Sequence, residues 1–123
     1  MDILNHWLSG ASFEGESTRT SPVYNPARGT VQKEVRLATV GDMDVAVAAA
    51  KAAFPAWANT SLAKRQRIIF TFRELLNERS EELARILTAE HGKVLSDAMG
   101  EVARGLEVVE LATGIPSLMK GEY

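Results

Sequence analysis

The spacing of apolar residues along this chain changes near residue 40. Before that point apolar and polar residues alternate: Val31, Val35 and Leu37 lie on one face of an extended segment, and Gln32, Glu34 and Arg36 on the other. Alternation at a period of two is typical of a β-strand. Beyond residue 40 apolar residues recur every three or four positions, which is typical of amphipathic helices. The pattern predicts a β-hairpin segment over residues 1–40 and a four-helix segment over residues 41–123.

The turn of the predicted hairpin lies in Y-N-P-A-R-G-T, residues 24–30. Pro26 fixes φ for a turn, Asn25 can bond its own backbone, and Gly29 tolerates the positive φ that a short loop with a bulge requires. A shorter hairpin is expected before it. The short apolar runs there hold Trp7, Leu8 and Phe13 and are broken by Ser9-Gly10, Gly15 and Pro22.

The first helix is expected to begin with Asp42 as its N-cap and Asp44 in its first turn. Its apolar face is formed by Val47, Ala50, Phe54 and Trp57, which recur at helical spacing. Pro55 is expected to end this helix or to bend its last turn, because proline cannot donate to the helical hydrogen-bond ladder.

The second and third helices follow a linker at residues 59–61 in which Ser61 supplies a new N-cap. The second helix has apolar residues at Ile68, Ile69, Phe72, Leu75 and Leu76, so it requires a surface to pack against. Ser80 is expected to cap the third helix, whose apolar side is Leu83, Ile86 and Leu87, and Gly92 is expected to close it.

The fourth helix has the most regular pattern. Its apolar seam runs through Leu95, Met99, Val102, Leu106, Val109 and Thr113 at alternating spacings of four and three. A neighbouring stripe of small residues, Ala98, Gly105 and Ala112, would let another backbone approach closely. Gly114 and Pro116 are expected to end the helix, with glycine in the left-handed conformation.

Composition excludes several classes of function. The net charge is −2 with both signs interspersed, so no electrostatic footprint for nucleic acid or for an anionic membrane is present. There is no cysteine, so the chain can form no disulfide, thiolate metal site or thiol nucleophile. The N-terminus lacks the features of a signal peptide and no apolar run is long enough to span a membrane. A cytoplasmic protein is expected.

Each candidate for chemistry has a simpler structural interpretation. His6 and His91 occur in unrelated contexts, Glu81 and Glu82 point apart, and Asp97 and Glu101 lie on an exposed helix face. The basic cluster Lys64–Arg67 has no interleaved aromatic residues, and Gly100 and Gly105 lie inside a helical pattern rather than after a strand. The sequence therefore predicts no catalytic, no cofactor-binding and no metal-binding residue.

The order of several motifs resembles the N-terminal part of the NAD(P)-dependent aldehyde dehydrogenase superfamily. These motifs are N-P-A-x-G at residues 25–29, D-x-D-x-A-V-A-A-A-x-A-A-F-x-x-W at 42–57, L-A-x-I-L-T-x-E-H-G-K at 83–93 and D-A-x-G-E-V at 97–102. The segments R-G-L-E-V-V-E-L-A (104–112) and G-I-P-S-L-M-K-G-E (114–122) are most similar to CoA-acylating methylmalonate-semialdehyde dehydrogenases. Ser117 departs from that subfamily, where a larger polar residue is expected.

The resemblance implies that a full-length relative has a Rossmann-like coenzyme domain, a catalytic domain and an oligomerisation arm. Such an enzyme oxidises methylmalonate or malonate semialdehyde with NAD⁺ and CoA through a cysteine thiolate, releasing CO₂. Its glycine turn, catalytic cysteine and most of its arm would follow the position of Tyr123. The resemblance thus implies a mainly α N-terminal fragment of an α/β fold that lacks the parallel sheet, binds no cofactor by itself and is catalytically inert alone.

Two functions from different classes remain open. The first is this inert N-terminal portion of a semialdehyde dehydrogenase. The second is a non-catalytic helical module that self-associates through its apolar helix faces, suggested by the seam and the small-residue stripe of the fourth helix. Nucleic-acid binding through Lys64–Arg67 is a remote third. The expected partner is therefore a second copy of the chain, with no nucleic acid and no membrane.

Overall fold

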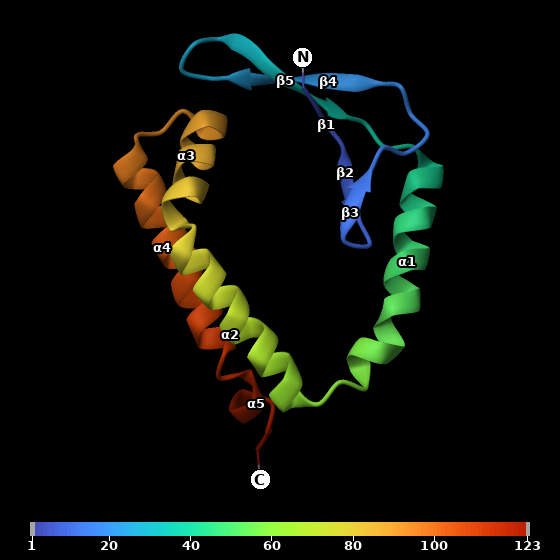
Figure 1. Cartoon of the computed structure of the whole chain (residues 1–123), viewed down its shortest axis with the longest axis vertical. Helices are drawn as coiled ribbons and strands as arrows, with labels where there is room; N and C mark the ends of the chain where they lie inside the picture. The colour runs from blue at the N-terminus through green and yellow to red at the C-terminus, as the bar shows by residue number, and fades with distance from the viewer. Residues whose placement is uncertain (1, 123) are drawn as a thin grey trace. The chain divides into compact units, whose positions relative to one another are not determined.

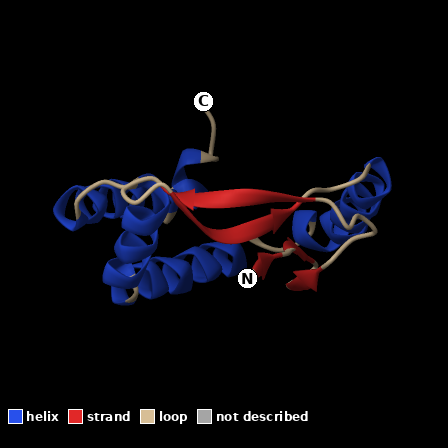
Figure 2. Ribbon diagram, turned by 90° about the horizontal axis from the view of Figure 1, so that it is seen from above, coloured by secondary structure: helices blue, strands red, loops and turns tan. Residues whose placement is uncertain are grey.

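The computed structural model describes residues 2–122. The chain divides into two compact units, Met1–Asn59 and Thr60–Tyr123. Strands give way to helices at Val40, as the periodicity predicts. The first helix nevertheless belongs to the same compact unit as the strands. Figure 1 follows the chain from the N-terminal strands to the C-terminal helices, and Figure 2 shows the same elements by type.

The strands of the first unit form two small sheets. β4 (Thr20–Asn25) and β5 (Thr30–Arg36) pair antiparallel, and β1 (Ile3–Leu4) joins the other edge of β5 in parallel, giving the order β1-β5-β4. β2 (His6–Leu8) and β3 (Ala11–Phe13) form a separate antiparallel pair. Both expected hairpins are present, whereas the parallel contact of β1 was not predicted.

The β4–β5 turn has the predicted chemistry. The Oδ1 atom of Asn25 accepts a hydrogen bond from the Ala27 N–H at 3.0 Å, and the carbonyl of Asn25 accepts one from the Gly29 N–H at 2.8 Å. Gly29 has a φ of 68°. The pairing register shifts between Val23 and Tyr24. Gln32 is the extra residue on β5 at this bulge, which lies within the strand pair and is separate from Gly29 in the turn.

α1 (Val40–Ala58) begins earlier than predicted, and Pro55 does not end it. Its N-cap is Thr39, not Asp42, which is instead the third helical residue and completes a capping box with Thr39. Pro55 lies inside the helix, which continues to Ala58. The proline removes one ladder bond near the helix end, and its own carbonyl still accepts from the Asn59 N–H at 3.1 Å. One lost bond so close to the terminus is not enough to end the helix.

α2 (Leu62–Glu78) and α3 (Ser80–His91) are separated by Arg79 alone. The side chain of Ser61 caps α2 as predicted, accepting from the Lys64 N–H at 3.4 Å. Ser80 does not cap α3, because the chain leaves α2 too late for Ser80 to adopt the extended cap conformation. Gly92 ends α3 with a φ of 83°, which confirms the predicted left-handed terminus.

α4 (Leu95–Ala112) carries the predicted seam, and all six seam residues are half-buried. The seam faces α2 and α3, which both pack on α4. The helix ends before Gly114, but Gly114 has a φ of −84° rather than the expected left-handed conformation. Pro116 lies in the first turn of a short further helix, α5 (Ile115–Leu118), where its missing N–H has no consequence. The helical segment therefore holds five helices in the described residues instead of four.

The tightest packing in the second unit is between α3 and α4. Ala84 of α3 and Ala98 of α4 are completely buried, so these small residues allow the close approach that the stripe on α4 predicted. Gly105 differs, since an added Cβ there would meet nothing within 4 Å. α2 is fastened to the end of α4 by the side chain of Gln66, whose Nε2 donates to the Thr113 carbonyl at 2.7 Å. No described helix is long and apolar enough to cross a membrane.

Candidate interaction face

The outer side of α2 and α3 is an exposed apolar surface. Ile68, Phe72 and Leu75 of α2 are 51%, 48% and 50% exposed, and Ile86 of α3 is 52% exposed. Phe72, Leu75, Leu83 and Ile86 line a groove of about 400 Å³, bordered by the ion pair of Arg79 with Glu82. We call this surface the α2–α3 face. Exposed apolar patches are typical of surfaces that another protein, or another part of the same protein, covers.

The sequence of α2 makes such a face unavoidable. Its apolar residues occupy more than one stripe of the helix, and α4, α5 and α3 all contact α2. Ile69 is half-buried, whereas Ile68 and Phe72 are exposed. Leu76 is half-buried and lines the same groove as Phe72 and Leu75. Leu106 and Val109 of α4 are also half-buried within the helical unit.

Two further apolar surfaces lie outside the α2–α3 face. On α1 the residues predicted to form one packed apolar face are exposed, with Val47 at 59% and Phe54 at 67%. Ala46 and Ala49 are the half-buried positions there. On α4, Val108 and Leu111 are 67% and 68% exposed, pointing away from the seam. Each of these helices presents apolar side chains that its own compact unit does not cover.

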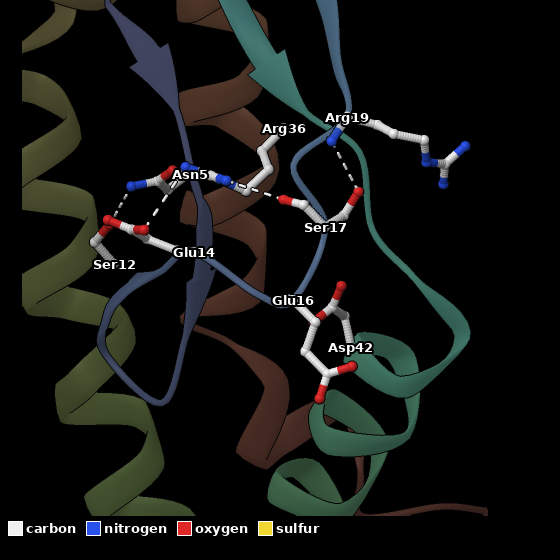
Figure 3. A network of polar contacts seen from close by, with 8 residues as sticks. All are labelled: Asn5, Ser12, Glu14, Glu16, Ser17, Arg19, Arg36 and Asp42. Carbon is white, nitrogen blue, oxygen red and sulfur yellow. Dashed lines mark hydrogen bonds and ion pairs between the residues drawn. The ribbon is translucent and has the colours of Figure 1, made fainter.

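The polar residues of the first unit form a structural network (Figure 3). The guanidinium of Arg36 on β5 donates from Nε to Asn5 Oδ1 at 3.1 Å and from one terminal nitrogen to the Ser17 carbonyl at 2.9 Å. Ser17 is only 7% exposed, and its Oγ accepts from the Arg19 N–H at 3.1 Å. The network ties the loop before β4 to β5 and to the N-terminus. The hydrogen bonds of Arg36 and Ser17 thus hold together segments that are distant in sequence.

Asp42 is the most buried charged residue, with 4% of its surface exposed. Its Oδ1 accepts from the Glu16 N–H at 3.0 Å, and its Oδ2 accepts from the N–H and hydroxyl of Thr39 at 2.7 and 2.9 Å. Asp42 therefore joins the loop after β3 to the start of α1. The sequence held a signal for the bonds between Asp42 and Thr39, since T-x-x-D at residues 39–42 is a capping-box pattern, but none for the bond to Glu16.

Acid is expected to weaken this junction. The hydrogen bond from the Thr39 backbone lowers the pKa of Asp42 below its ordinary value of 3.8, outweighing the opposite effect of burial. A lowered pKa contributes stability that is complete above pH 3.8 and is lost as the pH falls through the folded-state pKa. We expect the wild-type unit to lose stability below this pH and Asp42→Asn to remove that dependence. Tryptophan fluorescence during urea titration at several pH values measures it.

The control is Asp44→Asn, an exposed residue in the same helical turn. It should leave the acid dependence of the wild-type chain unchanged. An equal acid dependence in the wild-type chain and in Asp42→Asn would contradict the role assigned to Asp42. The fluorescence reports on the correct unit, because both tryptophans, Trp7 and Trp57, lie within Met1–Asn59.

Three of the four acidic candidates from the sequence are held in ion pairs. Glu82 pairs with Arg79 at 2.8 Å, Glu81 with Arg85 at 2.5 Å, and Glu101 with Lys93. The hydrogen bond from Lys93 lowers the pKa of Glu101, so this carboxyl is ionised rather than poised as an acid. His6 lies beside Phe13 with ring centroids 6.3 Å apart. Among residues 2–122, no three side chains of metal-ligand type come together.

Comparison with known proteins assigns the family. The aldehyde dehydrogenase family model matches residues 13–123, and the chain belongs to that family. It is 46% identical over 120 residues to a malonate-semialdehyde dehydrogenase of Bacillus thuringiensis and 47% identical over 121 residues to one of Geobacillus thermodenitrificans. Each alignment covers 98% of this chain and 25% of the relative. The chain spans about a quarter of the length of these curated relatives.

Solved structures give the same relationship. A protein from Sinorhizobium meliloti, assigned as a methylmalonate-semialdehyde dehydrogenase and solved with NAD, matches with a TM-score of 0.94 at 47% identity. The methylmalonate-semialdehyde dehydrogenase of Oceanimonas doudoroffii matches with a TM-score of 0.94 at 44% identity. Both cover 99% of this chain and 25% of the other. The mainly helical fold with its N-terminal hairpin therefore matches an N-terminal portion of the aldehyde dehydrogenase fold, as the motifs indicated.

The residues of this chain do not fit a dinucleotide by themselves. Gly100 and Gly105 lie within α4, so their backbone is used by the helix and cannot cradle a phosphate. The start of α1 is occupied by the Asp42 carboxylate, which would repel a pyrophosphate. Within residues 2–122 no glycine turn leads directly from a strand of a parallel sheet into a helix.

Proposed function

We propose that these residues serve as the N-terminal portion of a malonate- or methylmalonate-semialdehyde dehydrogenase that uses NAD⁺ and CoA. The observation that carries the proposal is the TM-score of 0.94 at 47% identity over 99% of the chain. The remaining three quarters of such an enzyme would supply the coenzyme site, the CoA site and the nucleophile. That remainder could lie on the same polypeptide or on another.

In this proposal the chain contributes packing and no chemistry. The sequence has no cysteine, so the thiolate that forms a thioester must come from elsewhere. The helices of the second unit would cover a sheet in the remainder of the enzyme through their exposed apolar residues. A cytoplasmic location belongs to the same proposal, and fractionation of cells that express the chain tests it.

Fragment complementation tests the assignment. The relative from Sinorhizobium meliloti, shortened by its matching quarter, is expressed with this chain, and NADH formation from malonate semialdehyde, NAD⁺ and CoA is followed. We expect turnover only when both polypeptides are present. This chain alone, with its mass verified, should be inactive. Any turnover by the chain alone would contradict the proposal that it is catalytically inert.

The control is the relative's own matching quarter supplied in the same way. If that quarter restores turnover to the shortened enzyme and this chain does not, the proposed role is wrong. If both restore turnover, the role is supported. Because both fragments have the same length relative to the enzyme, the comparison isolates what the sequence of this chain contributes.

A second candidate function is self-association of the chain into a homo-oligomer. The observation that favours it is the exposure of about half of each of Ile68, Phe72 and Leu75 on one side of α2. The seam of α4 no longer supports it, because its six residues are half-buried against α2 and α3. Nucleic-acid binding by the basic cluster gains no support, since Gln66 within it bonds the Thr113 carbonyl.

A further inference from the structure

The chain bends between α4 and α5 without the usual glycine terminus (Figure 1). Thr113 and Gly114 both have right-handed backbone conformations, with φ of −63° and −84°. A left-handed residue, which ends many helices, is therefore missing here. The Gly114 N–H bonds the Leu111 carbonyl at 3.0 Å, with the tighter spacing of a 3₁₀ turn. Contacts other than a glycine conformation must hold this bend.

Two local features favour the bend. Pro116 has no N–H, so it cannot donate to the carbonyl four residues before it, as a continuous helix would require. The hydroxyl of Thr113 donates back to the Glu110 carbonyl at 2.6 Å, and such contacts often bend helices. The Ser117 N–H bonds the Gly114 carbonyl at 3.0 Å. In a continuous helix it would bond the Thr113 carbonyl instead.

The Thr113 carbonyl is bonded from α2. Nε2 of Gln66 donates to it at 2.7 Å, although the two residues lie 47 positions apart. Gln66 is half-buried, and α2 also contacts α5. Gln66 therefore occupies the acceptor that Ser117 would need if α4 continued straight into α5.

A second contact holds the last turn of α4. Arg73 of α2 donates from Nε and Nη2 to the same carboxylate oxygen of Glu110, at 3.0 and 2.6 Å. Arg73 follows Gln66 by about two helical turns, so both side chains leave α2 on the same side. Glu110 lies about one turn before Thr113. The end of α4 is thus fastened to α2 at two points.

We infer that Gln66 is a positioning residue, which fixes the bend between α4 and α5 and so sets where residues 114–122 leave the helical unit. Without Gln66 the Thr113 carbonyl is free to accept from the Ser117 N–H or from water, and the bend is no longer fixed. The consequence for activity rests on the proposed function. In an enzyme of which this chain is the N-terminal portion, residues 114–122 lie where the remainder begins.

Hydrogen exchange of the isolated chain, followed by NMR, tests the inference directly. Gln66→Leu removes the donor and keeps a good helix former at this position. We expect the amides of residues 117–119 to exchange about tenfold faster in this variant, because a single helical turn does not persist once it is released from α2. The amides of α3 should keep their wild-type rates, which verifies that the unit is folded. Unchanged exchange at residues 117–119 would overturn the inference.

Gln66→Lys separates hydrogen bonding from packing. Lysine restores a donor on a flexible side chain, so exchange at residues 117–119 should return to within about threefold of the wild type. If the leucine and lysine variants exchange equally fast, the donor has no role and the inference is wrong. The matched control is Arg67→Leu, an exposed neighbour on α2 that should change these rates by less than about twofold.

Complementation of the shortened relative then tests the consequence for activity. With Gln66→Leu, the chain concentration that gives half-maximal turnover should rise about tenfold, because only part of the free chain has the bend required for docking. At saturating chain, kcat and the KM for malonate semialdehyde should stay within about twofold. A lower kcat with an unchanged half-saturating concentration would contradict the positioning role.

The two measurements can fail separately. If the wild-type chain does not complement the shortened relative but exchange at residues 117–119 depends on Gln66, the dehydrogenase role is rejected and the bend contact stands. If the wild-type chain complements but exchange does not depend on Gln66, the positioning role alone is rejected.

Discussion

Replacing Gly15 with alanine is expected to destabilise the N-terminal unit by about 3 kcal/mol. Gly15 has a φ of +72°, a conformation that costs an L-residue free energy wherever it occurs. An added Cβ would also lie 2.6 Å from Asp42 Oδ1. Asp42 cannot move away, because it holds the Glu16 N–H and Thr39 together. Urea unfolding followed by tryptophan fluorescence measures the loss.

Gly10→Ala is the control that separates strain from collision. Gly10 has a φ of +80°, yet an added Cβ would meet nothing within 4 Å. Its expected cost is about 1 kcal/mol, from the backbone conformation alone. The difference between the two variants then measures the contact with Asp42. Equal costs for Gly10→Ala and Gly15→Ala would show that Asp42 yields to the added methyl group.

Ala98→Leu is expected to have the second largest effect, a loss of about 3 kcal/mol from the helical unit. Ala98 is completely buried in α4, and so is Ala84 in the adjoining α3. A leucine at residue 98 must push the two helices apart, because the small residues set their separation. Hydrogen exchange of the amides of α3 and α4 in the intact chain measures the loss of protection.

The matched control is Ala103→Leu, at an exposed position of the same helix. Leucine and alanine are both good helix formers, so this change should leave stability within about 0.5 kcal/mol of the wild type. If Ala98→Leu is tolerated equally well, the α3–α4 contact is not the rigid centre of the unit. The contact between α2 and α4 would then be the next place to look for the residues that determine the stability of the unit.

Local patterns predicted the elements well but misplaced some of their ends. The β4–β5 turn and the Gly92 terminus were predicted correctly, because each depends on residues that are neighbours in sequence. The start of α1 was placed at Asp42, although the T-x-x-D pattern indicates Thr39 as the cap. In the structure Asp42 also accepts a hydrogen bond from the Glu16 N–H. These two residues are 26 positions apart, so no local pattern contains this contact.

The candidate interaction face was only half predictable. The apolar residues of α2 indicated that this helix requires a surface to pack against, and three of them, Ile68, Phe72 and Leu75, are about half exposed. Which residues remain exposed depends on the side from which α4 packs. Leu76 is half-buried and Phe72 is half exposed, although both belong to the same predicted apolar face.

The sequence by itself determined the family, the order of strands and helices, and the absence of any cysteine for covalent chemistry. These follow from residue identity and from periodicities that act within a few positions. Only the tertiary structure decided that the α4 seam is used inside the chain, that Asp42 joins two distant segments, and that Ile68, Phe72 and Leu75 are the exposed apolar residues of α2. Packing decides these points, because burial depends on which elements meet in space.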